Sequence, residues 1–106
     1  MATGTVKKVT NDSGTGYCKM PDGTLIQWGS SSIVTKQNAV VENIITYPIP
    51  FYDANMAIAV DKLTSATSCV ITANAFNNTT MTIAVYDTVN NTTRYFTWLA
   101  IGRWKA

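Results

Sequence analysis

Apolar residues recur at every second position along most of this chain, the spacing of β-strands that bury one face. The clearest case is residues 79–87, where Met81, Ile83 and Val85 alternate with small or polar side chains. β-Branched and aromatic residues dominate these segments, as a pleated surface favours. The strands predicted from this pattern are residues 16–20, 24–30, 43–49, 55–61, 68–76, 79–87 and 93–102. No window shows a convincing helical period, so we expect an all-β domain.

Turn-forming residues separate the predicted strands. Pro21-Asp22-Gly23 is a turn signal, and Asn77-Asn78 tolerates the positive φ that tight hairpins need. About seven short strands with such turns between them indicate an antiparallel β-sandwich. We assign residues 16–106 to this domain and residues 1–15 to an N-terminal connector.

The later strands are apolar on more than one face. In the last strand, one face carries Phe96, Trp98 and Ala100, and the other carries Tyr95, Leu99 and Ile101. A lone sandwich should present one solvated, charged face per sheet. One interpretation is a neutral, threonine-rich outer face. The other, which we favour, is contact between copies of the chain, where small residues permit close approach. The predicted interface consists of Thr82, Ala84, Tyr86, Phe96 and Trp98.

The composition narrows the classes of partner. Only 13% of residues are charged and the net charge is +2, whereas there are 17 Thr, 9 Asn and 6 Ser. So few and scattered basic residues argue against a nucleic-acid surface. A hydroxyl- and amide-rich surface suits neutral polar ligands, sugars foremost, or further copies of the chain. No stretch approaches the ~20 apolar residues of a membrane span, and the N-terminal residues lack the apolar region of a secretion signal.

Few residues point to catalysis. The sequence has no His, which removes Ser-His and Cys-His dyads and the usual zinc ligand sets. We expect Cys18 and Cys69 to be reduced thiols rather than a disulfide. Asp22 and Asp53 could still meet as a glycosidase pair, but a loop aspartate is more often a turn former. We therefore expect no enzyme, no metal and no cofactor.

Three motifs resemble those of a known family. The first is Gly16-Tyr17, Lys19, Pro21, Gly23 and Gln27-Trp28-Gly29; the second is Tyr47-Pro48-Ile49-x-Phe51; the third is Trp98-x-Ala100-Ile101-Gly102. In this order they resemble the C-terminal domain of tail fibre proteins of bacteriophages and prophages. The match covers roughly residues 16–102 and departs from the family pattern at Cys18 and in residues 103–106.

The resemblance implies an H-type-lectin-like β-sandwich that forms a homotrimer. It also implies a place at the tip of a fibre, attached to a shaft upstream, where a host surface glycan such as lipopolysaccharide, or a surface protein, is bound. The protein would then be a virion component assembled in the host cytoplasm. No binding residue is carried over, because the receptor contacts of the family vary.

Binding residues are therefore predicted from topology. If seven antiparallel strands each cross the sandwich, residues 21–23, 50–54, 77–78 and the C-terminal tail share one end. The N-terminus then shares the other end with residues 31–42, 62–67 and 88–92, so that a shaft there leaves the first end distal. Sugar sites combine an aromatic plate with amides and carboxylates. The predicted receptor-binding residues are Asp22, Tyr52, Asp53, Asn77, Asn78, Arg103 and Trp104.

Several alternatives remain open. A strand within residues 31–36 would exchange the ends of the later loops. Tyr52 and Trp104 could merely cap the sandwich. The domain could be a trimerisation and folding tip without receptor contact, or a small glycan hydrolase.

Overall fold

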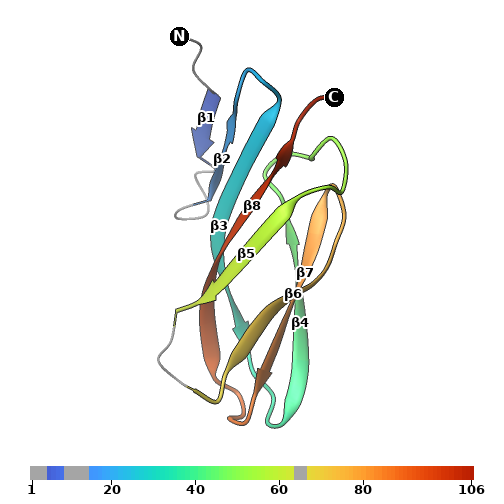
Figure 1. Cartoon of the computed structure of the whole chain (residues 1–106). Helices are drawn as coiled ribbons and strands as arrows, with labels where there is room; N and C mark the ends of the chain where they lie inside the picture. The colour runs from blue at the N-terminus through green and yellow to red at the C-terminus, as the bar shows by residue number, and fades with distance from the viewer. Residues whose placement is uncertain (1–4, 9–14, 64–66) are drawn as a thin grey trace.

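The chain forms two antiparallel sheets (Figure 1). The computed structural model describes residues 5–8, 15–63 and 67–106, and these residues contain strands and no helix. The larger sheet has the order β1-β2-β3-β8-β5 and the smaller β4-β7-β6. The strands are β1 (Thr5–Lys8), β2 (Gly16–Lys19), β3 (Thr24–Val34), β4 (Ala39–Thr46), β5 (Ala57–Lys62), β6 (Val70–Phe76), β7 (Thr80–Asp87) and β8 (Thr93–Arg103). The prediction of an all-β, antiparallel architecture is confirmed.

The larger sheet is built on one long ladder. β3 and β8 are 11 residues each and pair along their whole length, from Thr24 with Arg103 to Val34 with Thr93. β3 is longer than predicted because the run Ser30–Ser32 continues the strand although it interrupts the apolar pattern. The predicted strand 43–49 is shifted, since β4 begins at Ala39 and ends at Thr46.

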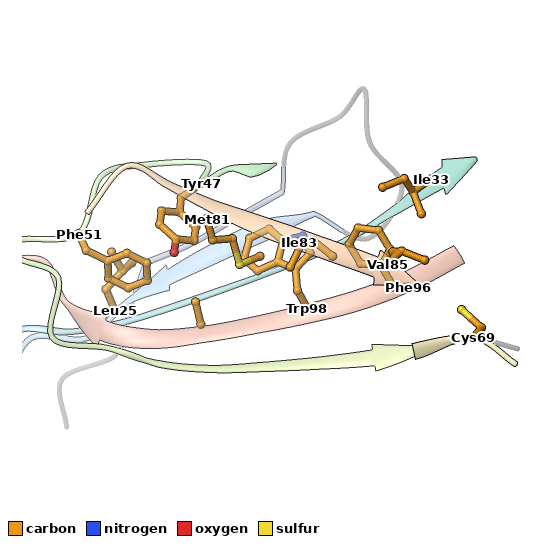
Figure 2. Close-up of a cluster of buried hydrophobic side chains, with 11 residues drawn as sticks. Leu25, Ile33, Tyr47, Phe51, Cys69, Met81, Ile83, Val85, Phe96 and Trp98 are labelled. Atoms are coloured by element: carbon orange, nitrogen blue, oxygen red, sulfur yellow. The ribbon is translucent and has the colours of Figure 1, made fainter. Parts of the chain in front are cut away.

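The hydrophobic core lies between the two sheets (Figure 2). Inward-facing Met81, Ile83 and Val85 of β7 are at most 1% exposed, as the alternation predicts. They pack against Phe96 and Trp98 of β8, which are 0% and 4% exposed. These two residues were predicted to form an interface between subunits, and that prediction is wrong. Side chains already buried within one chain have no surface left for a partner.

Strand β1 was not predicted, and it changes where the chain enters the fold. Thr5 pairs with Lys19, beside the β2–β3 turn, and Lys8 pairs with Gly16. β1 therefore starts at the end of the sandwich that carries residues 21–23 (Figure 1). The expectation that the N-terminal side lies at the opposite end is wrong, because an extra strand reverses the parity.

The predicted connector, residues 1–15, thus includes a strand of the sheet. Its residues 1–4 and 9–14 lie outside the described part of the chain. Cys18 and Cys69 are both free thiols, as expected.

Candidate receptor-binding site

Four chain segments meet at the end of the sandwich where β2 turns into β3. The amide of Tyr52 donates to the carbonyl of Arg103 (2.7 Å), and the amide of Trp104 donates to that of Gly23 (2.9 Å). The amide of Phe51 donates to the carbonyl of Asn78 (2.8 Å). The β2–β3 turn, the segment after β4, the β6–β7 turn and the C-terminal tail are thereby joined. Because residues 31–34 continue β3 rather than form a new strand, the predicted grouping of these loops holds.

The β2–β3 turn is fixed by its own side chains and by the C-terminal tail. Asp22 Oδ1 accepts a hydrogen bond from the amide of Thr24 (2.9 Å), and this bond holds the pKa of the Asp22 carboxyl below its usual value. Arg103 Nη2 donates to the carbonyl of Asp22 (2.8 Å). Gly23 has a φ of 101°, a left-handed conformation that glycine adopts without strain. The turn and the tail therefore form one unit.

The other polar residues predicted at this end mainly shape loops. Asp53 Oδ1 accepts from the amide of Asn55 (2.9 Å). Asn77 Oδ1 accepts from the amides of two following threonines, both at 2.9 Å. Asn78 Nδ2 donates to the carbonyl of Phe51 (3.5 Å). The carboxylates of Asp22 and Asp53 each serve their own turn, which is the behaviour of turn formers rather than of a glycosidase pair.

The two aromatic residues of the predicted site are placed differently. The indole N–H of Trp104 donates to the carbonyl of Met20 (2.8 Å), and the ring packs partly against the core. The side chain of Tyr52 is 56% exposed. Trp104 thus caps the sandwich, as one of the alternatives proposed, whereas Tyr52 presents its ring to solvent.

Sequence reasoning missed the cations around Trp104. The Nζ atoms of Lys19 and Lys105 lie 5.1 and 5.0 Å from the centre of its ring, within the range of a cation–π contact. The position of Lys19 in the β2–β3 hairpin could have revealed this contact. Lys19 ends β2 just before the turn, and the C-terminal tail crosses that turn at Gly23. The site is therefore more basic than the predicted set, with Lys19 and Lys105 beside Trp104 and Arg103 hydrogen-bonded to Asp22.

The other residues predicted at an interface lie on the outer face of the smaller sheet. Thr82 and Ala84 are half-buried there and Tyr86 is 38% exposed. Val40, Ile44 and Val70 flank them on the neighbouring strands and are 61%, 66% and 53% exposed. Asn74 Nδ2 donates to Glu42 Oε2 (2.9 Å), which links the two outer strands. This face is more apolar than a solvated sheet surface.

Within the described part of the chain there is neither a metal-binding cluster nor a membrane-spanning helix. Its residues contain no group of three or more His, Cys, Asp or Glu side chains placed to hold a metal ion. Nor is any helix among them long and apolar enough to cross a membrane.

A family model matches residues 19–103, and its family is described as "Putative tail fiber protein gp53-like, C-terminal". The chain belongs to this family. The fold of this tail fibre domain is similar to that of the R1 pyocin fiber of P. aeruginosa, with a TM-score of 0.68 and 20% identity. The match covers 93% of this chain and 28% of that one, so the domain spans well under a third of the fiber structure.

Two further fiber structures are similar. The R2 pyocin fiber of P. aeruginosa gives a TM-score of 0.72 at 21% identity, over 94% of this chain and 26% of that one. An N-truncated R1-type pyocin tail fiber gives 0.68 at 18% identity, over 93% of this chain and 84% of that one. No match was found among curated proteins. The resemblance to tail fibre proteins is confirmed.

The family motifs of the tail fibre domain meet in its interior. Gln27 is fully buried, and its side-chain amide both donates to the carbonyl of Ile49 (2.8 Å) and accepts from its amide (3.0 Å). A Cβ on Gly29 would lie 2.7 Å from Nε1 of Trp98, so glycine makes room for that indole. Gln27 and Gly29 of the first motif therefore hold residues of the other two motifs in place, and these buried motif residues report the fold.

Proposed function

We propose that this chain is the receptor-binding tip domain of a tail fibre and attaches the particle to a glycan on the host cell surface. Family membership supports a role in a tail fibre. The observation that carries the proposal is that hydrogen bonds from backbone amides and from the Arg103 side chain join Tyr52, Arg103 and Trp104 to the β2–β3 turn at Asp22 and Gly23. An exposed aromatic ring there stands beside fixed polar and basic groups, the combination that sugar sites use.

The chemistry of this end favours a glycan that carries acidic groups. Lys19, Arg103 and Lys105 surround the Trp104 ring and the β2–β3 turn. Tyr52 supplies the plate for the apolar face of a sugar ring, and the basic side chains supply hydrogen bonds to phosphate or carboxylate groups. Lipopolysaccharide is a glycan of this kind. The proposed role is binding, since the described carboxylates at this end, Asp22 and Asp53, each accept a hydrogen bond within their own turn.

We also propose that the domain acts as a homotrimer with an H-type-lectin-like arrangement. The apolar outer face of β4, β7 and β6 supports contact between copies, because Ala84 and Thr82 allow close approach between exposed Val40 and Ile44 side chains. Three equivalent sites on one tip would strengthen attachment through avidity.

Binding of the purified domain to host cells tests the proposal. Tyr52→Ala should weaken binding about tenfold, the loss of one aromatic stacking contact, and leave the melting temperature nearly unchanged because the ring is exposed. Trp104→Ala should weaken binding and also lower the melting temperature by several degrees, because it removes the hydrogen bond to Met20 and core packing.

Val89→Ala, which shortens an exposed side chain at the opposite end of the sandwich, is the control. Unchanged binding of Tyr52→Ala, with wild-type protein bound to cells, would show that this end does not contact the receptor.

A second candidate function is a trimerisation and folding tip without receptor contact. The observation in its favour is that Asp22, Asp53 and Asn77 use side-chain oxygens within their own turns. In that case wild-type protein should not bind any host cell, whereas it should still be a trimer.

A further inference from the structure

The outer face of the larger sheet changes character along its strands. Strand pairing aligns its outward side chains in rows across β3, β8 and β5. The rows nearer the β2–β3 turn are apolar and consist of Trp28, Leu99 and Ala59, then Ile26, Ile101 and Ala57. The next rows are Ser30, Thr97 and Asp61, then Ser32, Tyr95 and Leu63. Half of the face is therefore apolar, and the other half carries hydroxyls around one aromatic ring.

The hydroxyl-rich half is hollowed. An open hollow of about 580 Å³ is lined by Ser30, Ser31, Ser32, Leu63 and Tyr95. The side chain of Tyr95 is 57% exposed and that of Leu63 is 54% exposed. A volume of this size lies within the range of small-molecule sites. The hollow contains none of the residues predicted from the sequence.

The aromatic ring in this hollow stands on rigid backbone. Tyr95 pairs with Ser32 on one side, and on the other its carbonyl accepts a hydrogen bond from the amide of Leu63 (2.8 Å). The next residue, Phe96, is completely buried in the core. A side chain held in the middle of a sheet is better preorganised for binding than one on a loop.

The hollow also lies far from where the chain enters the fold. β1 starts at the end that carries the β2–β3 turn, because Thr5 pairs with Lys19. Tyr95 lies near the start of β8, and the amide of Thr35 donates to Thr92 just beyond it, so this half belongs to the opposite end. A ligand in the hollow would therefore bind near the end of the domain that lies away from the start of β1.

We propose that this hollow is a second saccharide-binding site, which takes a neutral, hydroxyl-rich sugar ring. The Tyr95 ring stacks on the apolar face of the sugar, and the Ser32 hydroxyl donates to and accepts from its hydroxyl groups. The exposed carboxylate of Asp61, one row away, accepts a further hydroxyl and repels an acidic sugar. The proposal rests on the proposed attachment of the domain to glycans, but it names a different surface and a different sugar chemistry.

The test is titration of the full chain with single neutral sugars, monitored by NMR. The probes are glucose, galactose, mannose, rhamnose and N-acetylglucosamine, with glucuronic acid as the acidic comparison. At least one neutral sugar should shift the resonances of Ser32 and Tyr95, and glucuronic acid should bind less well. Tyr95→Ala should weaken binding of that sugar about tenfold or more, whereas Tyr95→Phe, which keeps the ring, should retain most of it.

Two further variants make the result specific. Ser32→Ala removes one lining hydroxyl without adding an atom and should weaken binding of the same sugar, whereas Tyr52→Ala at the other end should not. Shifts confined to Tyr52 and Trp104, equal binding by Tyr95→Ala, or no binding of any neutral sugar overturns the second site.

Attachment of the same variants to host cells, measured in parallel, separates this proposal from the proposed function. If the wild-type protein binds cells but sugars do not shift the resonances of Tyr95, only the second site is contradicted. If it binds a neutral sugar at Tyr95 but binds no cell, only the proposed function is contradicted.

Discussion

At the scale of single residues, Asp87 is the buried charge around which the end opposite the β2–β3 turn is organised. Its side chain is completely buried, and Oδ2 accepts from Nε of Arg94 (2.7 Å) while Oδ1 accepts from the amide of Val89 (2.9 Å). Its carbonyl accepts from the amide of Asn38 (2.9 Å). One residue thus joins the β3–β4 loop to the β7–β8 loop.

The pKa of Asp87 makes a prediction about acid stability. Burial alone would raise it, but hydrogen bonds from Arg94, Val89 and Ser68 and the Arg94 charge outweigh burial and lower the pKa from 3.8 to about 2. Since the pKa is lower in the folded state, the stabilisation is fully present above the unfolded value and is lost as pH falls from about 4 towards 2.

We therefore expect Asp87→Asn to flatten the loss of stability between pH 4 and pH 2 and to lower the melting temperature at pH 7 by about 10 °C or more. Thermal unfolding followed by circular dichroism at several pH values measures both effects. Asp61→Asn, at an exposed position on β5, is the matched control. An acid slope that is the same in Asp87→Asn as in wild type would contradict the assignment.

At the scale of elements, β8 and β1 hold opposite kinds of position in the larger sheet, since β8 is an interior strand and β1 an edge strand. β8 has β3 on one side and β5 on the other, whereas β1 is a strand of four residues paired only with β2. Local opening requires the loss of few contacts in a short edge strand and of many in a central one.

Hydrogen exchange should follow this difference. We expect amides of β8 from Phe96 to Ala100 to exchange at least about a hundredfold more slowly than those of β1, because they open only with the whole core. Exchange measured by mass spectrometry on peptic peptides resolves the two strands. Equal protection of β1 and β8 would mean that the sheet is not organised around the β3–β8 ladder.

The same elements show how far sequence patterns reach. The alternation of Met81, Ile83 and Val85 predicted both β7 and its buried face, because one face of that strand is apolar and the other is not. β1 could not be predicted, since Thr5-Val6-Lys7-Lys8 is short and polar and is a strand only through pairing with β2. That one omission reversed the end at which the chain enters, although the loops at the end of the β2–β3 turn were grouped correctly.

For the site, the turn signals predicted which loops meet. Each strand crosses the sandwich once, so the number of strands between two loops decides whether those loops lie at the same end. The hollow at Tyr95 was missed because its lining comes from β3, β8 and the residue that follows β5. A run such as Ser30–Ser32 looks like a break in a strand until pairing with β8 is known.

At the scale of the whole molecule, the proposed trimer can be tested at its interface. Light scattering on the wild-type chain should give about three times its mass of 11.5 kDa. Ala84→Lys should lower this towards one chain mass, since a charge without a partner in an interface costs about 3 kcal/mol or more. Ala84 lies in the centre of the smaller sheet, opposite Glu42 and Thr72 on the neighbouring strands.

Leu99→Lys provides the comparison on the other exposed apolar face, where Leu99 is 39% exposed. Dissociation by Leu99→Lys but not by Ala84→Lys would move the contact to the larger sheet. A wild-type monomer at micromolar concentration would reject the trimer itself.

The meeting of Gln27, Gly29 and Trp98 in the interior has a consequence for host range. The buried motif residues Gln27, Gly29 and Trp98 hold the interior of the domain together, whereas the exposed rings of Tyr52 and Tyr95, which we propose as sugar contacts, do not. Under the proposed function, two domains of this family can therefore share the buried motif residues and still attach to different bacteria. Retargeting a particle then calls for substitutions around Tyr52 or Tyr95, with the buried signature left untouched as the frame on which new specificities are carried.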